Sequence, residues 1–344
     1  MATVSAVIVT FNRCAELRTA LDRLRRQSLA VAEILVVDDG STDGTGAMMR
    51  AAFPDVRYVR LPENRGLIWA RNFGFVNTTG DYVLSVDDDS WFVEDDGLAR
   101  AVAYMDSHPD VAAAACNITT RDGLVYLPTG AAPFEVPWYV GCGHLLRRTA
   151  VEQTGLYLAE FYRQGEEKDR GLRLYGAGWR VVALPDVMVH HHKSEKNRVP
   201  GLVRRFDHRN DLIREIARCP ARLLPWRFAR AWAGNTWKNL RHGPRRTDLW
   251  VLARLPEIVR IGLKHRKPVD EGAYRHWLHL AATAAPGRLG SAPASDPHPT
   301  LPHFALAGSS IPLTRQADPP DPLRAGEGCQ GGRRSSSPRE VGGG

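Results

Sequence analysis

Three consecutive carboxylates, Asp87, Asp88 and Asp89, follow an apolar run at residues 82–86 that has the length of a buried strand. Side chains alternate along an extended segment, so Asp87 and Asp89 can point to the same side and share one divalent cation. Open α/β sheets bind ligands at the carboxyl ends of their strands, which is where this triplet lies. An acidic turn without a metal is the alternative that the triplet alone leaves open.

Three histidines, His190, His191 and His192, end another apolar run at residues 187–189. The same alternation puts His191 on the face of Val187 and Val189, where a neutral imidazole could complete a metal site. We therefore predict Asp87, Asp89 and His191 as metal ligands, although a lone histidine more often has a structural role.

Two further segments could bind a nucleotide diphosphate. The loop at residues 38–43 follows the strand predicted at 33–37, and a carboxylate there can accept a hydrogen bond from a base N–H or a ribose hydroxyl. The helix predicted over residues 66–77 begins just past a glycine and carries Arg71 and Asn72. A helix N-terminus with guanidinium groups nearby suits a diphosphate. An ordinary turn and plain surface residues are the alternatives.

Clustered acids open the helix predicted over residues 166–175, with Glu166, Glu167 and Asp169 in its first turn. Acids at a helix start usually compensate the helix dipole. One of them, held over the site, could instead act as general base toward an acceptor hydroxyl.

The elements that must position these residues alternate between short apolar runs and helical patterns, from residue 4 to about residue 184. This alternation is typical of βαβ units with a largely parallel sheet. We predict early strands at 5–9, 33–37, 56–61 and 82–86, and a first helix through Leu17, Leu21 and Leu24 that Asn12 caps. A shorter helix is predicted near residues 149–154.

Positive charge is concentrated towards the C-terminus. The chain has a net charge of +8, yet residues 193–267 hold 20 Lys and Arg against 6 Asp and Glu, with four tryptophans interleaved. This segment could face an anionic membrane surface, a nucleic acid or a phosphorylated substrate, or could be a solvated helical face. After residue 285 the composition turns to Pro, Gly and Ser, which predicts disorder.

Composition also limits the location of the chain. No run near 18 apolar residues predicts a membrane span, and the N-terminal residues do not resemble a secretory signal. Five scattered cysteines without a C-x-x-C pair fit a reducing compartment. We expect a cytoplasmic protein, with peripheral attachment to the inner face of the membrane as an option. The expected regions are a catalytic domain at 1–192, with halves 1–110 and 111–192, a basic helical extension at 193–284, and a tail at 285–344.

Taken in order, these segments resemble the family-2 glycosyltransferases of the GT-A fold. Residues 7–13 and 36–43 look like that family's first two nucleotide-binding segments, and 64–66 with 70–74 resemble the third. Residues 86–90 look like its D-x-D metal motif, 141–148 like its acceptor-side strand, and 166–169 like its E-D-x-D base motif. The resemblance covers residues 4–192.

The resemblance implies a Rossmann-like, mainly parallel sheet flanked by helices, with a metal and diphosphate at Asp87 and Asp89 and a base at Glu167. It implies donor contacts, with the nucleotide base at Asp39, for these residues: Thr10, Asn12, Arg13, Asp39, Gly66, Arg71, Asn72, Asp87 and Asp88. The family usually has Asp where this chain has Glu167. The extra methylene moves the carboxylate by about 1 Å, a displacement that can slow catalysis.

We therefore expect an inverting hexosyl- or deoxyhexosyltransferase that uses Mg²⁺ or Mn²⁺ and a UDP, GDP or dTDP sugar. Its acceptor would be a hydroxyl of a saccharide, a lipid-linked or polysaccharide-linked group, or another small molecule. A non-catalytic nucleotide-sugar-binding paralogue and a sugar-1-phosphate nucleotidyltransferase are the alternatives. The second would need a glycine-rich loop after the first strand, and residues 10–13 contain no glycine. Nucleic-acid binding would not explain the acidic strand ends.

Overall fold

The computed structural model describes residues 2–193, 201–242 and 246–284, which belong to one unit that extends over Met1–Ala294. The tail that we predicted to be disordered, at residues 285–344, lies outside the described residues. The boundaries that we predicted after residues 110 and 192 stay predictions.

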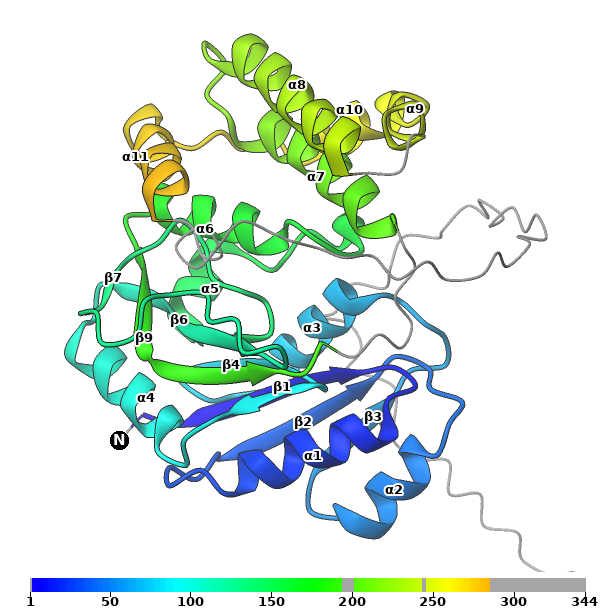
Figure 1. Cartoon of the computed structure of the whole chain (residues 1–344), viewed down its shortest axis with the longest axis vertical. Coiled ribbons are helices and arrows are strands. Elements are labelled where there is room, and N and C mark those ends of the chain that lie inside the picture. The colour runs from blue at the N-terminus through cyan, green and yellow to red at the C-terminus, as the bar shows by residue number, and fades with distance from the viewer. Residues whose placement is uncertain (1, 194–200, 243–245, 285–344) are drawn as a thin grey trace, which may run out of the picture. The chain divides into compact units, whose positions relative to one another are not determined.

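A mixed sheet of nine strands forms the centre of this unit (Figure 1). Its strands are β1 (Val4–Thr10), β2 (Glu33–Asp38), β3 (Arg57–Arg60), β4 (Tyr82–Asp87), β5 (Ser90–Phe92), β6 (Val111–Thr120), β7 (Phe134–Glu135), β8 (Gly143–Arg147) and β9 (Arg180–His191). The order is β3-β2-β1-β4-β8-β6-β9-β5, and β7 pairs with β9. Strands β3, β2, β1 and β4 run parallel to one another. Strand β8 is antiparallel to both β4 and β6, and β6 is parallel to β9. The predicted mainly parallel α/β fold is confirmed.

Helices cover both faces of the sheet. They are α1 (Cys14–Arg25), α2 (Thr45–Ala52), α3 (Leu67–Val76), α4 (Gly97–Ser107), α5 (Arg148–Thr154), α6 (Glu166–Gly176), α7 (Leu202–Arg218), α8 (Leu224–His242), α9 (Thr247–Leu252), α10 (Leu255–Lys264) and α11 (Glu271–Thr283). Ala6 and Ile8 of β1 pack with residues of α1, α2 and α4, whereas Val7 packs with residues of α3, α5 and α6. Because both faces are apolar, polar side chains gather at the strand ends.

The turn after β1 differs from our prediction. We expected Asn12 to cap the first helix, but Arg13 occupies the N-cap position and makes no side-chain cap. Asn12 has φ 53° and accepts hydrogen bonds from the backbone N–H of Thr42, at 2.7 Å, and of Asp43. The Asp43 carboxylate accepts instead from Cys14 N at 3.2 Å. The cap prediction was wrong because the neighbouring loop supplies the acceptor.

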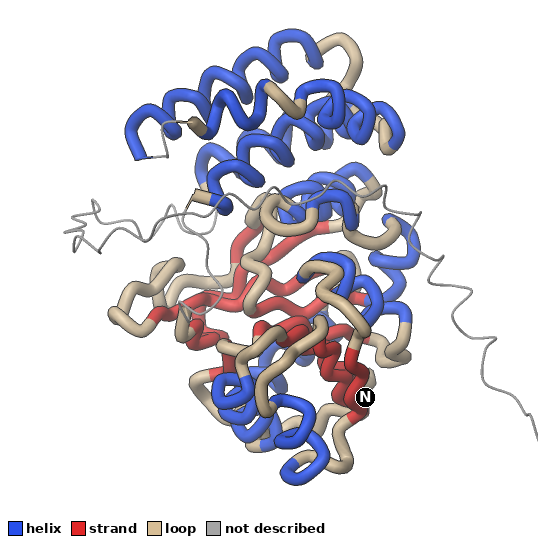
Figure 2. Tube along the Cα trace, turned by 90° about the vertical axis from the view of Figure 1, so that its right-hand side faces the viewer, coloured by secondary structure: helices blue, strands red, loops and turns tan. Residues whose placement is uncertain are grey.

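Helices α7 to α10 lie together beyond α6, on the face of the sheet that α3, α5 and α6 cover (Figures 1 and 2). Helix α7 packs against α6, α8, α9 and α10. None of the helices in the described ranges combines the length and the hydrophobicity that a bilayer crossing requires.

Candidate active site

The three predicted metal ligands lie together at the carboxyl edge of the sheet. Asp87 ends β4, Asp89 follows in the next turn, and His191 ends β9. One ligand atom from each lies within 4.8 Å of the other two, and His191 Nε2 is 3.4 Å from Asp89 Oδ1. Asp89 is fully buried, while Asp87 is partly exposed. Two carboxylates and an imidazole therefore converge where the sequence predicted them.

Asp88 turns toward the end of β1. Its carboxylate accepts hydrogen bonds from Thr10 Oγ1 and from Arg13 Nη1, both at 2.9 Å. Arg13 Nη1 also lies 3.1 Å from Asp89. Burial raises the pKa of Asp88 to about 7, although Arg13 opposes that shift. Thr10 and Arg13, which we predicted as donor contacts, hold the acidic triplet in this structure.

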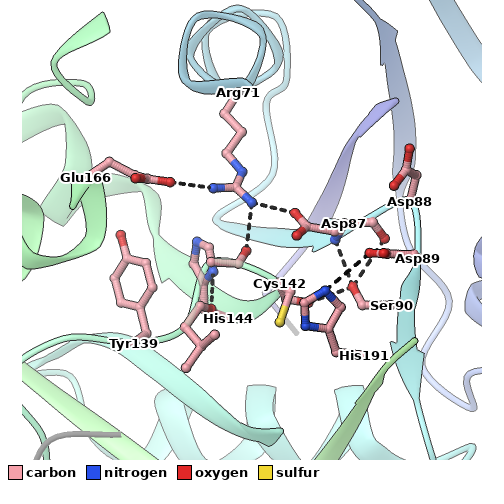
Figure 3. Close-up of polar contacts among 12 residues, drawn as sticks. Arg71, Asp87, Asp88, Asp89, Ser90, Tyr139, Cys142, His144, Glu166 and His191 are labelled. Carbon is pink, nitrogen blue, oxygen red and sulfur yellow. Dashed lines mark hydrogen bonds and ion pairs between the residues drawn. The ribbon is translucent and has the colours of Figure 1, made fainter. Parts of the chain in front are cut away.

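Arg71 joins the acidic triplet to the first turn of α6 (Figure 3). Its Nη1 lies 3.0 Å from Glu166 Oε1, and its Nη2 donates to the Asp87 carboxylate and, at 3.0 Å, to the carbonyl of Gly141. Burial disfavours the charged form of Arg71, but Asp87 and Glu166 outweigh burial and raise its pKa. We expected Arg71 to face a diphosphate; the structure places it between the two carboxylates.

Glu167, the predicted base, lies beside Gly141. A Cβ atom added at Gly141 would be 2.5 Å from Glu167 Oε1 and 3.0 Å from Arg71 Nη1. Burial and the neighbouring Glu166 raise the pKa of Glu167 above the usual carboxyl range. The sequence analysis placed Gly141 in the segment 141–148 that resembles an acceptor-side strand but gave the glycine itself no role, and the strand β8 begins only at Gly143. The glycine lets the base approach Arg71.

Asp39 holds the loop before α3. Its two carboxylate oxygens accept from the backbone N–H of Arg65, at 2.6 Å, and of Gly66, at 2.9 Å. Burial raises the pKa of Asp39 to about 6, although these two hydrogen bonds lower it. Gly66 has φ 89°, and a Cβ there would lie 2.6 Å from the ring of Tyr162. Contact of Asp39 with a nucleotide base stays a prediction.

The side-chain amide of Asn72 forms hydrogen bonds through both its nitrogen and its oxygen. Its Nδ2 donates to the Tyr157 carbonyl at 2.9 Å, and its Oδ1 accepts from Tyr157 N at 3.0 Å. This pair joins α3 to the segment that precedes α6. Asn72 therefore positions the segment around Tyr157, and its contact with the donor stays a prediction.

A buried aromatic cluster lies beside this site and was missed by sequence reasoning. The hydroxyls of Tyr139 and Tyr157 are 2.6 Å apart, and Tyr157 Oη lies 3.3 Å from His144 Nε2. The Arg170 guanidinium lies 4.1 Å from the centre of the Tyr157 ring. Burial lowers the pKa of His144, so the imidazole is neutral. The four residues come from separate segments, and no local pattern connects them.

Comparison with known proteins decides the family. The sequence model for glycosyl transferase family 2 matches residues 5–155. The PGL/p-HBAD biosynthesis glycosyltransferase of Mycobacterium tuberculosis is 32% identical over 207 residues, which cover 59% of this chain and 73% of that protein. This chain belongs to glycosyltransferase family 2. Its fold is the GT-A fold.

Other family-2 relatives match over shorter stretches. The uncharacterized glycosyltransferase YwdF of Bacillus subtilis is 34% identical over 173 residues, 46% of this chain and 63% of YwdF. Glycosyltransferase GlyA of Streptococcus pneumoniae is 37% identical over 94 residues, 27% of this chain and 14% of GlyA. The chain thus spans less than two thirds of these two relatives.

Solved glycosyltransferases share the fold at low sequence identity. GalNAc-T7 with UDP, GalNAc and Mn²⁺ has a TM-score of 0.59 and 15% identity, covering 83% of this chain and 58% of the other. Staphylococcus aureus TarS 1–349 in complex with UDP-GlcNAc has a TM-score of 0.54 and 18% identity, with coverages of 82% and 92%. The mannosyltransferase PcManGT from Pyrobaculum calidifontis, in complex with GDP-Man and Mn²⁺, has a TM-score of 0.50 and 18% identity, with coverages of 81% and 84%.

Proposed function

We propose that this family-2 glycosyltransferase is an inverting, metal-dependent enzyme. It transfers a hexosyl or deoxyhexosyl group from a nucleotide-diphosphate donor to an acceptor hydroxyl. The observation that carries the proposal is one arrangement. The ligand cluster of Asp87, Asp89 and His191 is linked through Arg71 to the turn that holds Glu167.

The donor atoms of this cluster suit a divalent cation. Two carboxylate oxygens and one imidazole nitrogen fit Mn²⁺ well, whereas Mg²⁺ prefers oxygen ligands and water. Asp87, Asp89 and His191 would hold the ion. When bound, it would neutralise negative charge on the leaving diphosphate. The complexes of GalNAc-T7 and PcManGT with Mn²⁺ support this choice by analogy of fold.

The nucleotide would lie at the ends of β1 and β2, where Asp39 shapes the loop before α3. The structural neighbours were solved with UDP-GlcNAc and with GDP-Man, so UDP and GDP sugars are the first donors to test. A dTDP sugar completes the donor panel. Asp87 and Asp88 remain our proposed contacts near the diphosphate.

Glu167 would act as the general base. The acceptor oxygen attacks the anomeric carbon as the bond from that carbon to the diphosphate oxygen breaks, and the diphosphate leaves with the electron pair. The acceptor proton moves to the Glu167 carboxylate. Arg71 pairs with Glu166 at 3.0 Å, and we assign no covalent role to either carboxylate, so the proposed transfer is one displacement with inversion. The raised pKa of Glu167 makes this residue a stronger base than an ordinary carboxylate.

The acceptor remains open between saccharides and lipid-linked or polysaccharide-linked hydroxyls. The mycobacterial relative is named for PGL/p-HBAD biosynthesis, which supports testing glycolipid-type acceptors first. A cytoplasmic location is our expectation for an enzyme that uses nucleotide sugars.

Release of free nucleoside diphosphate from a panel of UDP, GDP and dTDP sugars, with Mn²⁺ and then with EDTA, tests the proposal. We expect release from one donor class with Mn²⁺ and its loss with EDTA. A chain that binds a donor but releases nothing with any acceptor would be the non-catalytic paralogue. Family membership decides against the sugar-1-phosphate nucleotidyltransferase.

A further inference from the structure

In the described part of the chain, exposed large hydrophobic side chains are concentrated on the C-terminal helices. Eight of the eleven large hydrophobic side chains that are exposed among the described residues lie between Val203 and Leu263. Scattered exposed apolar residues are normal on a protein surface, but a concentration in one segment marks an interaction face.

On helix α8 these side chains form one stripe. Trp226 is 67% exposed, Trp237 57% and Leu240 75%. Residues 226, 230, 233, 237 and 240 follow the spacing of one helical face, and the smaller members, such as Ala233, are exposed as well. The stripe extends over 15 residues, or about 21 Å of helix. We call it the α8 face.

The opposite side of α8 is fixed to the rest of the unit. Trp232 packs against the ring of His208, with ring centres 5.1 Å apart. Asn235 donates to the Asp211 carboxylate at 3.2 Å, and Asn239 donates to Asp248 at 2.9 Å. These buried contacts set the rotation of the helix, so the α8 face points outward because the inner side is already used.

The α8 face is also cationic. No acidic residue occurs between Glu215 and Asp248. Four exposed cations accompany the stripe on α8 or just before it: Arg222, Arg230, Lys238 and Arg241. The Arg241 guanidinium lies 4.3 Å from the centre of the Trp237 ring. Arginine and tryptophan together suit the depth of lipid headgroups, where an apolar ring and a charged tip are both satisfied.

We propose that the α8 face docks on an anionic lipid surface, with the helix lying in the plane of the headgroups. An amphipathic helix of this kind binds through its apolar side chains and its cations together. A second copy of the chain is a poor occupant, because a symmetric contact would oppose the same cations. A nucleic acid would use the cations but not the exposed Leu240.

The test is co-sedimentation of the full chain with vesicles of equimolar phosphatidylglycerol and phosphatidylcholine, and with pure phosphatidylcholine vesicles, at low and high salt. We expect salt-sensitive binding to the anionic vesicles alone. An apolar variant (W226S/W237S/L240S) and a charge variant (R222Q/R230Q/R241Q) should both lose it. Loss of three cations, at about fivefold each, lowers the partition coefficient about 10²-fold.

Matched controls make the same changes elsewhere on the surface. V93S/L124S removes exposed apolar side chains, and R18Q/R50Q/R121Q removes three exposed cations. Both controls should bind vesicles like the wild type. Thermal unfolding and, where a donor is found, release of nucleoside diphosphate without vesicles should be unchanged in the α8 variants.

Three results would overturn the proposal. The first is that the wild-type chain does not bind vesicles at low salt. The second is that it binds neutral and anionic vesicles equally. The third is that both α8 variants bind as strongly as the wild type. Binding to polyglutamate or DNA without binding to vesicles would also overturn it and assign the cations to an acidic polymer. None of these outcomes depends on the proposed transfer reaction.

Discussion

Arg218 donates a hydrogen bond from its Nε to the buried Asp169 carboxylate at 2.7 Å, and this contact ties α7 to the helix that carries Glu167. Arg173 lies 2.8 Å from the other oxygen of Asp169. A second link runs from Lys168 to Asp211, at 3.4 Å. The candidate base is thus positioned in part by the helices that follow the sheet.

Replacing Arg218 with Gln should therefore destabilise the chain. The change leaves part of the Asp169 charge uncompensated in the interior, which costs about 3–5 kcal/mol for a broken buried pair. Urea unfolding measures this loss. The D169N/R218Q double variant should lose less than the sum of the two single variants, and strictly additive losses would show that the pair is not coupled.

Removing a metal ligand should abolish catalysis while the chain still folds. In Asp89→Ala the release of nucleoside diphosphate should stop, and Mn²⁺ should no longer increase the thermal stabilisation that a nucleoside diphosphate provides. Asp22→Ala, at an exposed position on α1, is the matched control and should behave as the wild type. Turnover at the wild-type rate in Asp89→Ala, or an EDTA-resistant native enzyme, would contradict the metal assignment.

Glu167→Gln should reduce kcat by roughly 10²–10⁴ and leave donor affinity nearly unchanged, because the amide cannot accept a proton. Since burial and Glu166 raise the pKa of Glu167, the wild-type rate should increase with pH above the usual carboxyl range. The residual rate of the Glu167→Gln variant should not show this increase with pH. Glu166→Gln serves as comparison: a dead Glu166 variant beside an active Glu167 variant would move the base to Glu166.

The pKa of Asp39 should appear in the pH dependence of stability. Its pKa of about 6 in the folded chain is above the ordinary aspartate value of 3.8, so the folded state holds the Asp39 proton more tightly than the unfolded chain does. The contribution is therefore full below pH 4 and is lost as pH rises to about 6. Two pKa units correspond to about 3 kcal/mol. The free energy of unfolding of the wild type, measured relative to Asp39→Asn, should fall by up to this amount across that interval. A constant difference would show that the pKa of Asp39 is the same in the folded and the unfolded chain.

Local patterns were sufficient to predict the acidic strand ends. Asp87, Asp89 and His191 do lie together, because β4 and β9 end at the same edge of the sheet and Ser90 pairs with His191. The reason differs from the predicted alternation, since Asp88 and Asp89 lie in a turn and not in an extended segment. The partners of Arg71 could not be predicted in this way. Glu166 is 95 positions away, and Gly141 reaches Arg71 only because β8 pairs antiparallel with β4.

The turn after β1 shows the same limit at short range. Asn12 has the residue type of a helix cap, but the choice of acceptor depends on where the Asp43 loop lies. The positions of Asn72 and Asp39 were predictable, whereas their backbone partners at Tyr157, Arg65 and Gly66 were not. The sequence shows which side chains can donate or accept hydrogen bonds. Which partner each of them takes is set by how the helices and strands pack.

The close approach of Tyr162 to Gly66 has a consequence for attempts to re-engineer the enzyme. A side chain at 66 would meet the Tyr162 ring at 2.6 Å, so the two positions share one volume. Libraries that diversify the donor loop while Tyr162 is fixed will recover glycine at 66 and sample little. Pairing a larger residue at 66 with glycine or alanine at 162 frees that volume but leaves the φ of 89° at 66, which residues with a Cβ rarely adopt, so glycine should persist at 66 in double-site libraries as well.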